Sequence, residues 1–421
     1  MSSSSSLQPP SSPHPPIRPP SFTSYSPQSH SPLFTTLPPE LRHQIFTYAL
    51  SSSEDDDPAR AYSRETYWTR PGQAAPRKIH TALLRTCKLA YTEAWFMPFA
   101  LAEHVFYLTA SERAPGLGGL TPVEFEKFLG VIHAVHSNSQ SQAEPGNGDS
   151  ESERDAEREK ESTESIIETG PIRLFAQLYI LEPGDALQEL FDIKHFAPKS
   201  VTLTLRYTDF WHWENNQRLY IAAKWVNKVR FPSSVTRFTM DFESIERRKQ
   251  EVDLLVEQAV EQWRFVRKDG GILRASKGDV SVSRWSGSSM FGGKRWVRDE
   301  DPRRPGVLDY YVVSVTWKLD RSSLEVPNPD QVVHEDVPTI RILSDFVQIS
   351  PPFTAWLTSL TENEMRMAGV GMDVPAEEAA EAVRAFRASS MAARARSRSI
   401  GRGLRIGSIM RRAARGGGDL I

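Results

Sequence analysis

Three β-rich stretches separated by helical patterns constrain the fold of this chain more than any other feature. They are rich in β-branched and aromatic residues and begin about 30 residues apart. Between them, apolar residues recur at helical spacing. We expect strands over Ile172–Leu181, Ser200–Tyr207 and Ser234–Phe242, and helices over Leu187–Phe196 and Leu219–Val229. This alternation predicts an α+β fold whose body is an irregular βα layer, curved like a leucine-rich repeat.

Further periodic segments extend the predicted body on both sides of these units. A long helix is expected from Ile245 to Lys268, and a last strand from Asp309 to Leu319. Before the repeated units, His104–Leu108 is predicted to be a short strand. Thr121 opens another predicted helix, because it begins a capping box with proline at the first helical position. The inward-facing residues of the long helix are expected to be Val252, Leu255, Ala259, Val260 and Trp263.

Composition identifies segments that cannot form a core. Residues 1–32 are a Ser/Pro tract, and residues 137–169 are an acidic insertion with almost no apolar residues. Both, like the C-terminal tail, are predicted to be disordered. Residues 51–76 are polar and rich in turn formers, so a loop insertion is expected there. The predicted organisation is an N-terminal region over 33–109, a strand–helix body over 110–350, and a short helical segment with an Arg-rich tail over 351–421.

Charge and cysteine content narrow the expected compartment. The 421 residues carry a formal net charge of -2, so the whole chain is neither a polyanion nor a polycation. Cys87 is the single cysteine and cannot form an intramolecular disulfide, which favours a reducing compartment. The N-terminus lacks the basic and apolar parts of a secretory signal, and no stretch reaches the roughly 18 apolar residues of a membrane span. We therefore predict a nuclear or cytoplasmic protein with no membrane partner.

Two amphipathic helices are predicted near the N-terminus. The first is preceded by Pro38 and begins with Pro39 and Glu40, which suit the first turn and the positive end of the helix dipole. Its apolar face is expected to contain Leu41, Ile45, Phe46 and Ala49. Thr81 can cap the second helix. The apolar face of that helix is expected to contain Leu83, Leu84, Cys87, Ala90, Tyr91 and Ala94.

The two helices carry the sequences LPPELRHQIFTYAL and ALLRTCKLAYTEA. These sequences resemble the fungal F-box-like family, and the resemblance covers roughly Leu33 to Phe242 with the first helix as its most specific part. It implies a helical pair packed on the βα layer that docks onto the adaptor subunit of a cullin-RING ubiquitin ligase. The rest of the chain would then present a protein substrate that the sequence does not identify. The implied partner-binding residues are Leu37, Pro38, Leu41, Ile45, Phe46, Leu84 and Cys87.

Two other interpretations of the sequence are open. An apolar stripe at helical spacing is more often core than interface, so the chain could be a scaffold protein of the same fold that does not bind the adaptor. The tail from Arg384 to Arg415 contains ten arginines and no acidic residue. Such a run can bind an import receptor or the phosphate backbone of a nucleic acid. A nucleic-acid-associated protein is therefore the third hypothesis.

Motifs for catalysis, cofactors or metals are weak in this sequence. The stretch GSSMFGGKRW lacks the glycine spacing and the Ser/Thr of a phosphate loop, so a surface loop is expected there. His133 and His136 are one helical turn apart but have no third ligand nearby, so no metal site is predicted. Trp211 and Trp213 are expected to pack against a neighbouring helix. Because no nucleophile–base–acid set is identifiable, we predict a non-enzyme with no catalytic residue and no cofactor.

Overall fold

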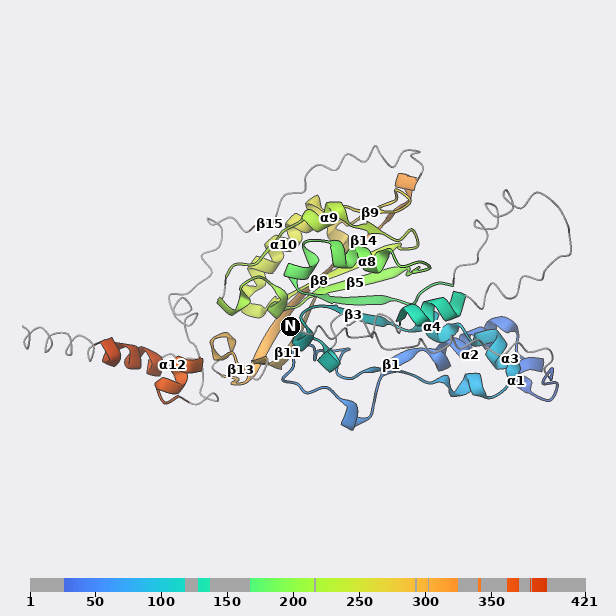
Figure 1. The fold of residues 1–421 in the computed structure, drawn as a ribbon, viewed down its shortest axis with the longest axis horizontal. Helices are drawn as coiled ribbons and strands as arrows, with labels where there is room; N and C mark the ends of the chain where they lie inside the picture. Colours follow the sequence, from blue (N-terminus) through green and yellow to red (C-terminus); the bar gives the residue numbers. More distant parts are fainter. Residues whose placement is uncertain are drawn as a thin grey trace, which may run out of the picture.

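A computed structural model shows a curled sheet with helices packed along it and a group of short helices beside one of its edges (Figure 1). The chain therefore has the predicted α+β fold. Within the described part of the chain, no helix is long and apolar enough to cross a membrane. The structure describes residues 26–117, 128–136, 167–215, 217–291, 294–301, 303–324, 340–341, 362–370, 379 and 381–391.

The group of short helices lies at the N-terminal end of the described chain. Its members are α1 (Pro32–Thr35), α2 (Pro39–Leu50), α3 (Lys88–Ala94) and α4 (Met97–Leu101). The first predicted helix is confirmed, because α2 follows Pro38 and carries Glu40 in its first turn. These helices share a small apolar core of their own, which consists of Phe46, Leu50, Ala90, Ala94 and Met97.

The predicted second helix is wrong in its extent. Residues 81–94 form a short 3-10 helix, η2 (Thr81–Arg85), and then α3, with a break at Cys87. Cys87 has extended backbone angles, and its Sγ accepts a hydrogen bond from the Ala90 N–H at 3.4 Å. Thr86 Oγ1 donates to the Leu83 carbonyl at 2.7 Å and closes η2. These local side-chain bonds offer the backbone an alternative to a continuous helix.

The predicted loop over residues 51–76 contains a strand and is not a free excursion. Strand β1 (Ser52–Glu54) pairs antiparallel with β2 (Arg77–Ile79) at the far end of the segment. Asp57 then caps a 3-10 turn, η1 (Pro58–Arg60), by accepting the Ala59 N–H at 3.0 Å. A three-residue strand is too short to show an alternating pattern, and its partner lies more than twenty residues away, so composition alone predicted a loop.

The described residues form a mixed sheet of nine strands. The order across it is β3 (His104–Leu108), β4 (Ile172–Ala176), β5 (Ser200–Leu205), β8 (Arg237–Ile245), β14 (Val307–Asp320), β10 (Ile272–Arg274), β9 (Phe265–Arg267) and β7 (Arg230–Phe231), with β11 (Val280–Ser288) paired to β14. The first four strands are parallel. Strand β14 runs antiparallel to β8, β10 and β11.

Strands β4, β5 and β8 lie in the three predicted β-rich stretches, and they are parallel neighbours as stacked βα units require. The first predicted strand is too long, because it ends at Ala176 and Leu178–Leu181 are helical. The short strand before them and the last strand, β14, are also confirmed. The leucine-rich-repeat-like layer does not continue past β8, because β14 pairs antiparallel with β8 from Tyr310 to Lys318. A repeat period in the sequence shows which segments form units, but it does not show which distant strand completes the sheet.

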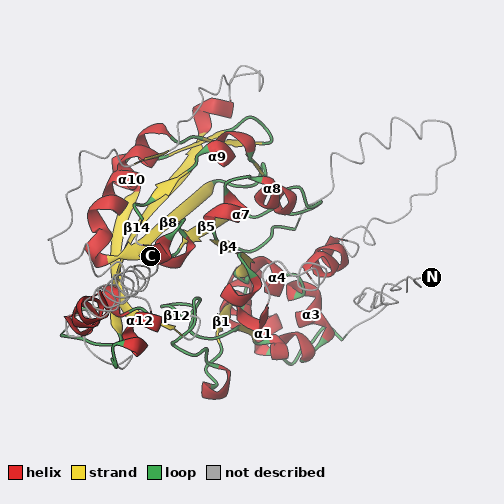
Figure 2. Ribbon diagram, turned by 60° about the vertical axis from the view of Figure 1, so that its left-hand side comes forward, coloured by secondary structure: helices red, strands yellow, loops and turns green. Residues whose placement is uncertain are grey.

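Four helices cover one face of the sheet: α7 (Leu178–Leu181), α8 (Asp185–Phe191), α9 (Lys224–Lys228) and α10 (Lys249–Gln262) (Figure 2). Their centre is aromatic. The Trp225 ring lies edge-on to Trp263 at 5.7 Å, and Phe265 lies edge-on to Trp317 at 5.1 Å. Helix α10 is shorter than the helix predicted from Ile245 to Lys268. It ends at Gln262, before Trp263, and the chain continues as β9.

Side-chain alternation gives the two faces of the sheet opposite characters. In β8, Phe238, Met240 and Phe242 are fully buried against the helices. Asp241, one residue along, points to the other face and accepts hydrogen bonds from Thr204 Oγ1 at 2.9 Å and Ser314 Oγ at 2.6 Å. The helix-covered face therefore holds the core, and the opposite face carries polar side chains that can order the segments packed on it.

The described chain also contains smaller strands and helices. They are β6 (Tyr220–Ile221), β12 (Met290–Phe291), β13 (Lys294–Arg295), β15 (Ile340–Arg341), α12 (Glu362–Met367), and helical residues 128–136 and 381–391. The predicted start of a helix at Thr121, most of the Ser/Pro tract, most of the acidic insertion and the tail after residue 391 lie outside the described residues.

The junction between the helical group and the sheet generates a first prediction. Gly170 precedes β4 and donates its N–H to the Phe99 carbonyl at 3.2 Å, and a Cβ at this position would lie 2.0 Å from the Ala102 carbonyl oxygen. Gly170→Ala is therefore expected to lower the free energy of unfolding in urea by about 1–3 kcal/mol. The matched control is Gly130→Ala, where an added Cβ meets nothing within 4 Å. Wild-type stability in the Gly170 variant would contradict this account of the junction.

Candidate functional site

The outer face of α2 carries a stripe of exposed apolar side chains. Leu41 is 46% exposed, Ile45 is 43% exposed and Tyr48 is 83% exposed. They are separated by four and three residues, so they lie on one face of the helix. Pro38 is exposed at the start of this helix, and Leu37 before it is half-buried. We call Leu41, Ile45 and Tyr48 the α2 stripe.

The opposite face of α2 holds the helix in place. Phe46 is 1% exposed and Leu50 is fully buried in the core of the helical group. Arg42 Nε and Nη2 donate to the two carboxylate oxygens of Glu93 in α3 at 3.0 and 2.9 Å. Arg42 Nη1 also donates to the Leu37 carbonyl at 2.9 Å. A bidentate ion pair fixes the orientation of its two partners as well as their distance. The pair and the buried side chains together fix the rotation of α2 about its axis, and so determine which of its residues face outward.

The structure divides the seven predicted partner-binding residues into two sets. Pro38, Leu41 and Ile45 lie on the surface, and Leu37 is half-buried beside them. The prediction that Phe46 contacts a partner is corrected, because its side chain is core. Successive helical residues are 100° apart, so Ile45 and Phe46 can point to opposite environments although both fit the apolar pattern. Leu84 and Cys87 are half-buried and pack against the same core as Phe46.

Sequence reasoning missed Tyr48 as a member of the exposed stripe. It lies three residues after Ile45 and seven after Leu41, which is the spacing of a single helical face. Its phenol group is compatible with either core or surface, so composition gave it no special weight. The exposure of 83% now makes it the most accessible apolar side chain of α2. Tyrosine is also one of the residue types enriched at protein interfaces.

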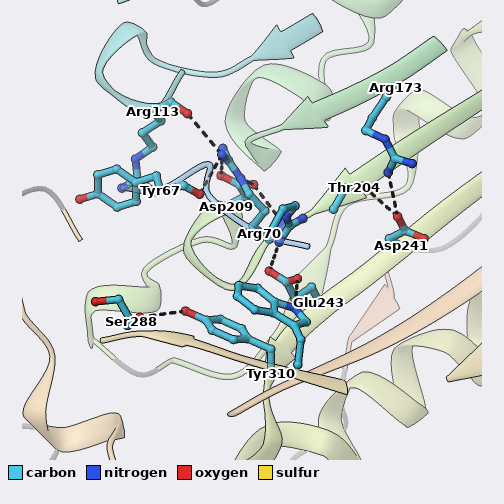
Figure 3. A network of polar contacts seen from close by, with 12 residues as sticks. Tyr67, Arg70, Arg113, Arg173, Thr204, Asp209, Asp241, Glu243, Ser288 and Tyr310 are labelled. Carbon is cyan, nitrogen blue, oxygen red and sulfur yellow. Dashed lines mark hydrogen bonds and ion pairs between the residues drawn. The ribbon is translucent and has the colours of Figure 1, made fainter. Parts of the chain in front are cut away.

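A second candidate site is the network of charged side chains at the carboxyl ends of β5 and β8 (Figure 3). Glu243 in β8 forms an ion pair with Arg70, which comes from the segment predicted to be a loop. Trp285 in β11 donates its Nε1–H to the same carboxylate at 3.0 Å. The side chains of Arg70 and Glu243 are 10% and 4% exposed, so this pair is largely removed from water.

Arg206 forms the second half of this network. Its Nε donates to Asp209 Oδ2 at 2.6 Å, and its Nη2 donates to Asp209 Oδ1 at 3.0 Å. Nη1 donates to the carbonyls of Tyr67 and Arg113 at 3.1 and 3.2 Å. Burial disfavours a bare guanidinium, but the Asp209 carboxylate outweighs it and keeps the pKa of Arg206 above its ordinary value. Arg206 thus remains charged and joins three separate segments.

The network is a structural clamp. In parallel sheets, ligands often bind in a crevice at the carboxyl ends of the strands. Here, however, the cavity beside Arg70 and Glu243 measures about 20 Å³, which is room for about one water molecule. The charged groups described above are paired with one another or with backbone carbonyls. We infer that they fasten residues 62–73 to the polar face of the sheet.

The two tryptophans Trp211 and Trp213 and the glycine-rich stretch contribute to packing in the structure. Trp211 is half-buried beside Tyr179 of α7 and its Nε1–H donates to Glu182 at 2.8 Å, as expected for packing against a helix. Trp213 is 2% exposed but packs against Phe291 and Trp296, so its predicted packing on a neighbouring helix is wrong. The glycine-rich stretch forms a small hairpin, β12–β13, whose Phe291 ring stacks on Tyr67 at 5.6 Å. Within the described residues, no group of three His, Cys, Asp or Glu side chains could hold a metal ion.

Comparisons with protein-family models, curated proteins and solved structures found no match to this chain.

The buried clamp generates a second prediction. Arg70→Met leaves the Glu243 carboxylate buried without its charged partner, and loss of one member of a buried pair typically costs about 3–5 kcal/mol. The variant is expected to unfold at lower urea concentration and to be cleaved faster by protease within residues 62–73. Arg284→Met is the matched control, because the Arg284–Glu246 pair is 53% and 39% exposed and is expected to contribute about 0–1 kcal/mol. Equal effects of the two substitutions would show that Arg70 is not a clamp.

His104 generates a third prediction, on pH. Burial lowers the pKa of His104 below its ordinary value of 6.5, although a 2.9 Å hydrogen bond from Nε2 to the Phe99 carbonyl partly offsets the effect. The unfolded chain therefore takes up this proton at a higher pH than the folded chain does. The free energy of unfolding should fall as the pH is lowered through 6.5, and it should fall less in His104→Gln. Identical pH dependence of the two proteins in urea titrations would contradict the assignment.

Proposed function

We propose that this chain is a non-catalytic interaction protein that docks onto the adaptor subunit of a cullin-RING ubiquitin ligase through the α2 stripe. The observation that carries the proposal is the exposure of Leu41 and Ile45, at 46% and 43%, within the helix that resembles the first F-box helix. Aliphatic side chains at these positions are not used by the core. Exposed apolar side chains that gather on one surface are typical of protein interfaces.

The construction of the helical group supports this role. Docking by a helix face requires that the helix keep one orientation before the partner arrives, because ordering it on binding would weaken the affinity. The Arg42–Glu93 pair and the buried Phe46 provide that order from the opposite face of α2. The recognition would be of the helix-in-groove type, in which a few apolar anchors carry most of the binding energy.

The remainder of the chain fits the role of a substrate-presenting body. Strand β3 follows α4 directly and belongs to the large sheet, so the helical group and the sheet are joined by continuous structure. A rigid connection of this kind would hold a bound protein substrate near the ligase and so support the transfer of ubiquitin to it. The chain would contribute proximity and no chemistry. Catalysis would then belong to the partner complex.

Adaptor binding provides the fourth prediction. Leu41→Asp and Ile45→Asp each place a charge on the α2 stripe without entering the core, so both variants should fold. Loss of such an anchor costs about 2 kcal/mol or more, which is roughly thirtyfold in affinity. We expect wild-type chain to bind purified adaptor by calorimetry and both variants to bind at least about thirtyfold more weakly.

The control for this experiment is Leu324→Asp. Leu324 is 46% exposed, the same value as Leu41, but it lies in the short 3-10 helix after β14. Circular dichroism should be unchanged in all three variants. Failure of the wild-type chain to bind the adaptor would favour the scaffold interpretation. Equal binding by all variants would place the docking surface away from α2.

A further inference from the structure

Strand β3 is an edge of the large sheet. Within the described residues it pairs with β4 on one side only, and the order of strands begins with it (Figure 1). The free side of an edge strand presents backbone N–H and C=O groups that can pair with another strand. Natural proteins usually cover such an edge or protect it with charged side chains. Whether β3 can pair with another strand therefore depends on the residues around its free side.

The backbone of β3 shows which groups face outward. His104 N–H donates to the Pro171 carbonyl at 2.8 Å, and the Leu108 carbonyl accepts from Gln177 N–H at 3.0 Å, so these residues bond toward β4. In a parallel pair, alternate residues point their backbone groups to opposite sides. Val105 therefore directs its N–H and C=O away from β4. Glu103, two residues earlier, does the same and donates its N–H to Ser52 Oγ of β1 at 3.3 Å.

A cavity of about 620 Å³ lies along this outer side. Its lining includes the consecutive residues 103–107, although successive side chains of a strand point to opposite faces. The cavity must therefore follow the edge of β3 and not one of its faces. Ser52 of β1 also lines it, which agrees with the outward direction of the Glu103 N–H. The volume lies within the range of about 300–1,000 Å³ that is typical of ligand sites.

The walls of this β3 cavity are mainly apolar. Trp95, Phe99, Phe106 and Phe128 contribute aromatic rings, and Val131 of helical residues 128–136 lies at the mouth with 46% exposure. Charge is confined to a pair: Glu103 binds Arg77, and it accepts a second bond from Arg173 Nε at 2.8 Å. Such walls favour a large apolar side chain of a ligand. Their described residues offer no unpaired carboxylate that would favour a basic side chain.

We propose that an extended peptide segment of a partner protein pairs with the outer edge of β3 and inserts one aromatic or large aliphatic side chain into the β3 cavity. Val105 exchanges backbone hydrogen bonds with the peptide. Strand addition of this kind gives affinity through the backbone and specificity through the pocket. If the proposed function holds, this surface is the site that binds the protein substrate. Binding of a peptide to β3 does not itself depend on that function.

The test uses a phage-displayed library of random peptides about 12 residues long, selected on the full chain, with the best binder titrated by fluorescence polarisation. We expect selected peptides to share an aromatic or large aliphatic anchor. Val105→Pro removes the outward N–H and spares the bonds of β3 to β4, so it should weaken binding at least about tenfold. Val105→Ala retains the N–H and should bind like wild type.

Two further variants keep the test decisive where proline disturbs β3. Val131→Trp should fill the mouth of the cavity and weaken binding, whereas Val282→Trp, at a valine that is 50% exposed on β11, should not.

The outcomes separate this proposal from adaptor docking. Peptide binding should be unchanged in Ile45→Asp, so it can succeed or fail independently of the α2 stripe. Absence of any selected binder would overturn the proposal. Binders that ignore Val131→Trp would lie elsewhere on the chain and would also overturn it. Binders that are blocked by Val131→Trp but ignore Val105→Pro would occupy the cavity without strand pairing, which contradicts the mode of recognition proposed.

Discussion

The burial of Phe46 and Leu50 in the helical group is the constraint on which the functional account depends. These two side chains fix one face of α2 against the core that contains Ala90 and Ala94. Because a helix has a fixed angular step, the direction of every other side chain on α2 then follows. Leu41, Ile45 and Tyr48 remain outside although they are apolar. The α2 stripe is thus a consequence of how the helix is anchored.

The same region shows where sequence patterns lose resolution. The sequence predicted α2 and its apolar residues, but it grouped Ile45 with Phe46 on one face. The two residues are adjacent, and a pattern of apolar positions cannot tell which side of a broad stripe meets the core. That choice depends on the small residues of α3 and on the Arg42–Glu93 pair, whose members are 51 positions apart. Cys87 likewise belongs to the predicted apolar face of the second helix, whereas its sulfur caps α3.

The body of the fold was more predictable in its units than in its connections. Strands β3, β4, β5, β8 and β14 carry runs of β-branched and aromatic residues, and the structure places strands in all five segments. The clamp was not predictable, because Arg70 meets Glu243 across 173 positions of sequence. The cavity along β3 was also not predictable, since it forms where residues 52–79, α4, helical residues 128–136 and the edge of the sheet meet. Contacts between distant segments leave no periodic trace in a sequence.

The central claim, that the outer face of α2 is the docking surface, is tested most directly by hydrogen–deuterium exchange of the full chain with and without purified adaptor. The account predicts that the adaptor slows exchange in peptides covering residues 38–50. Peptides from α8 and α10, on the helix-covered face of the sheet, should exchange at the same rate in both samples. Protection confined to other segments, or no protection at saturating adaptor, would contradict the account.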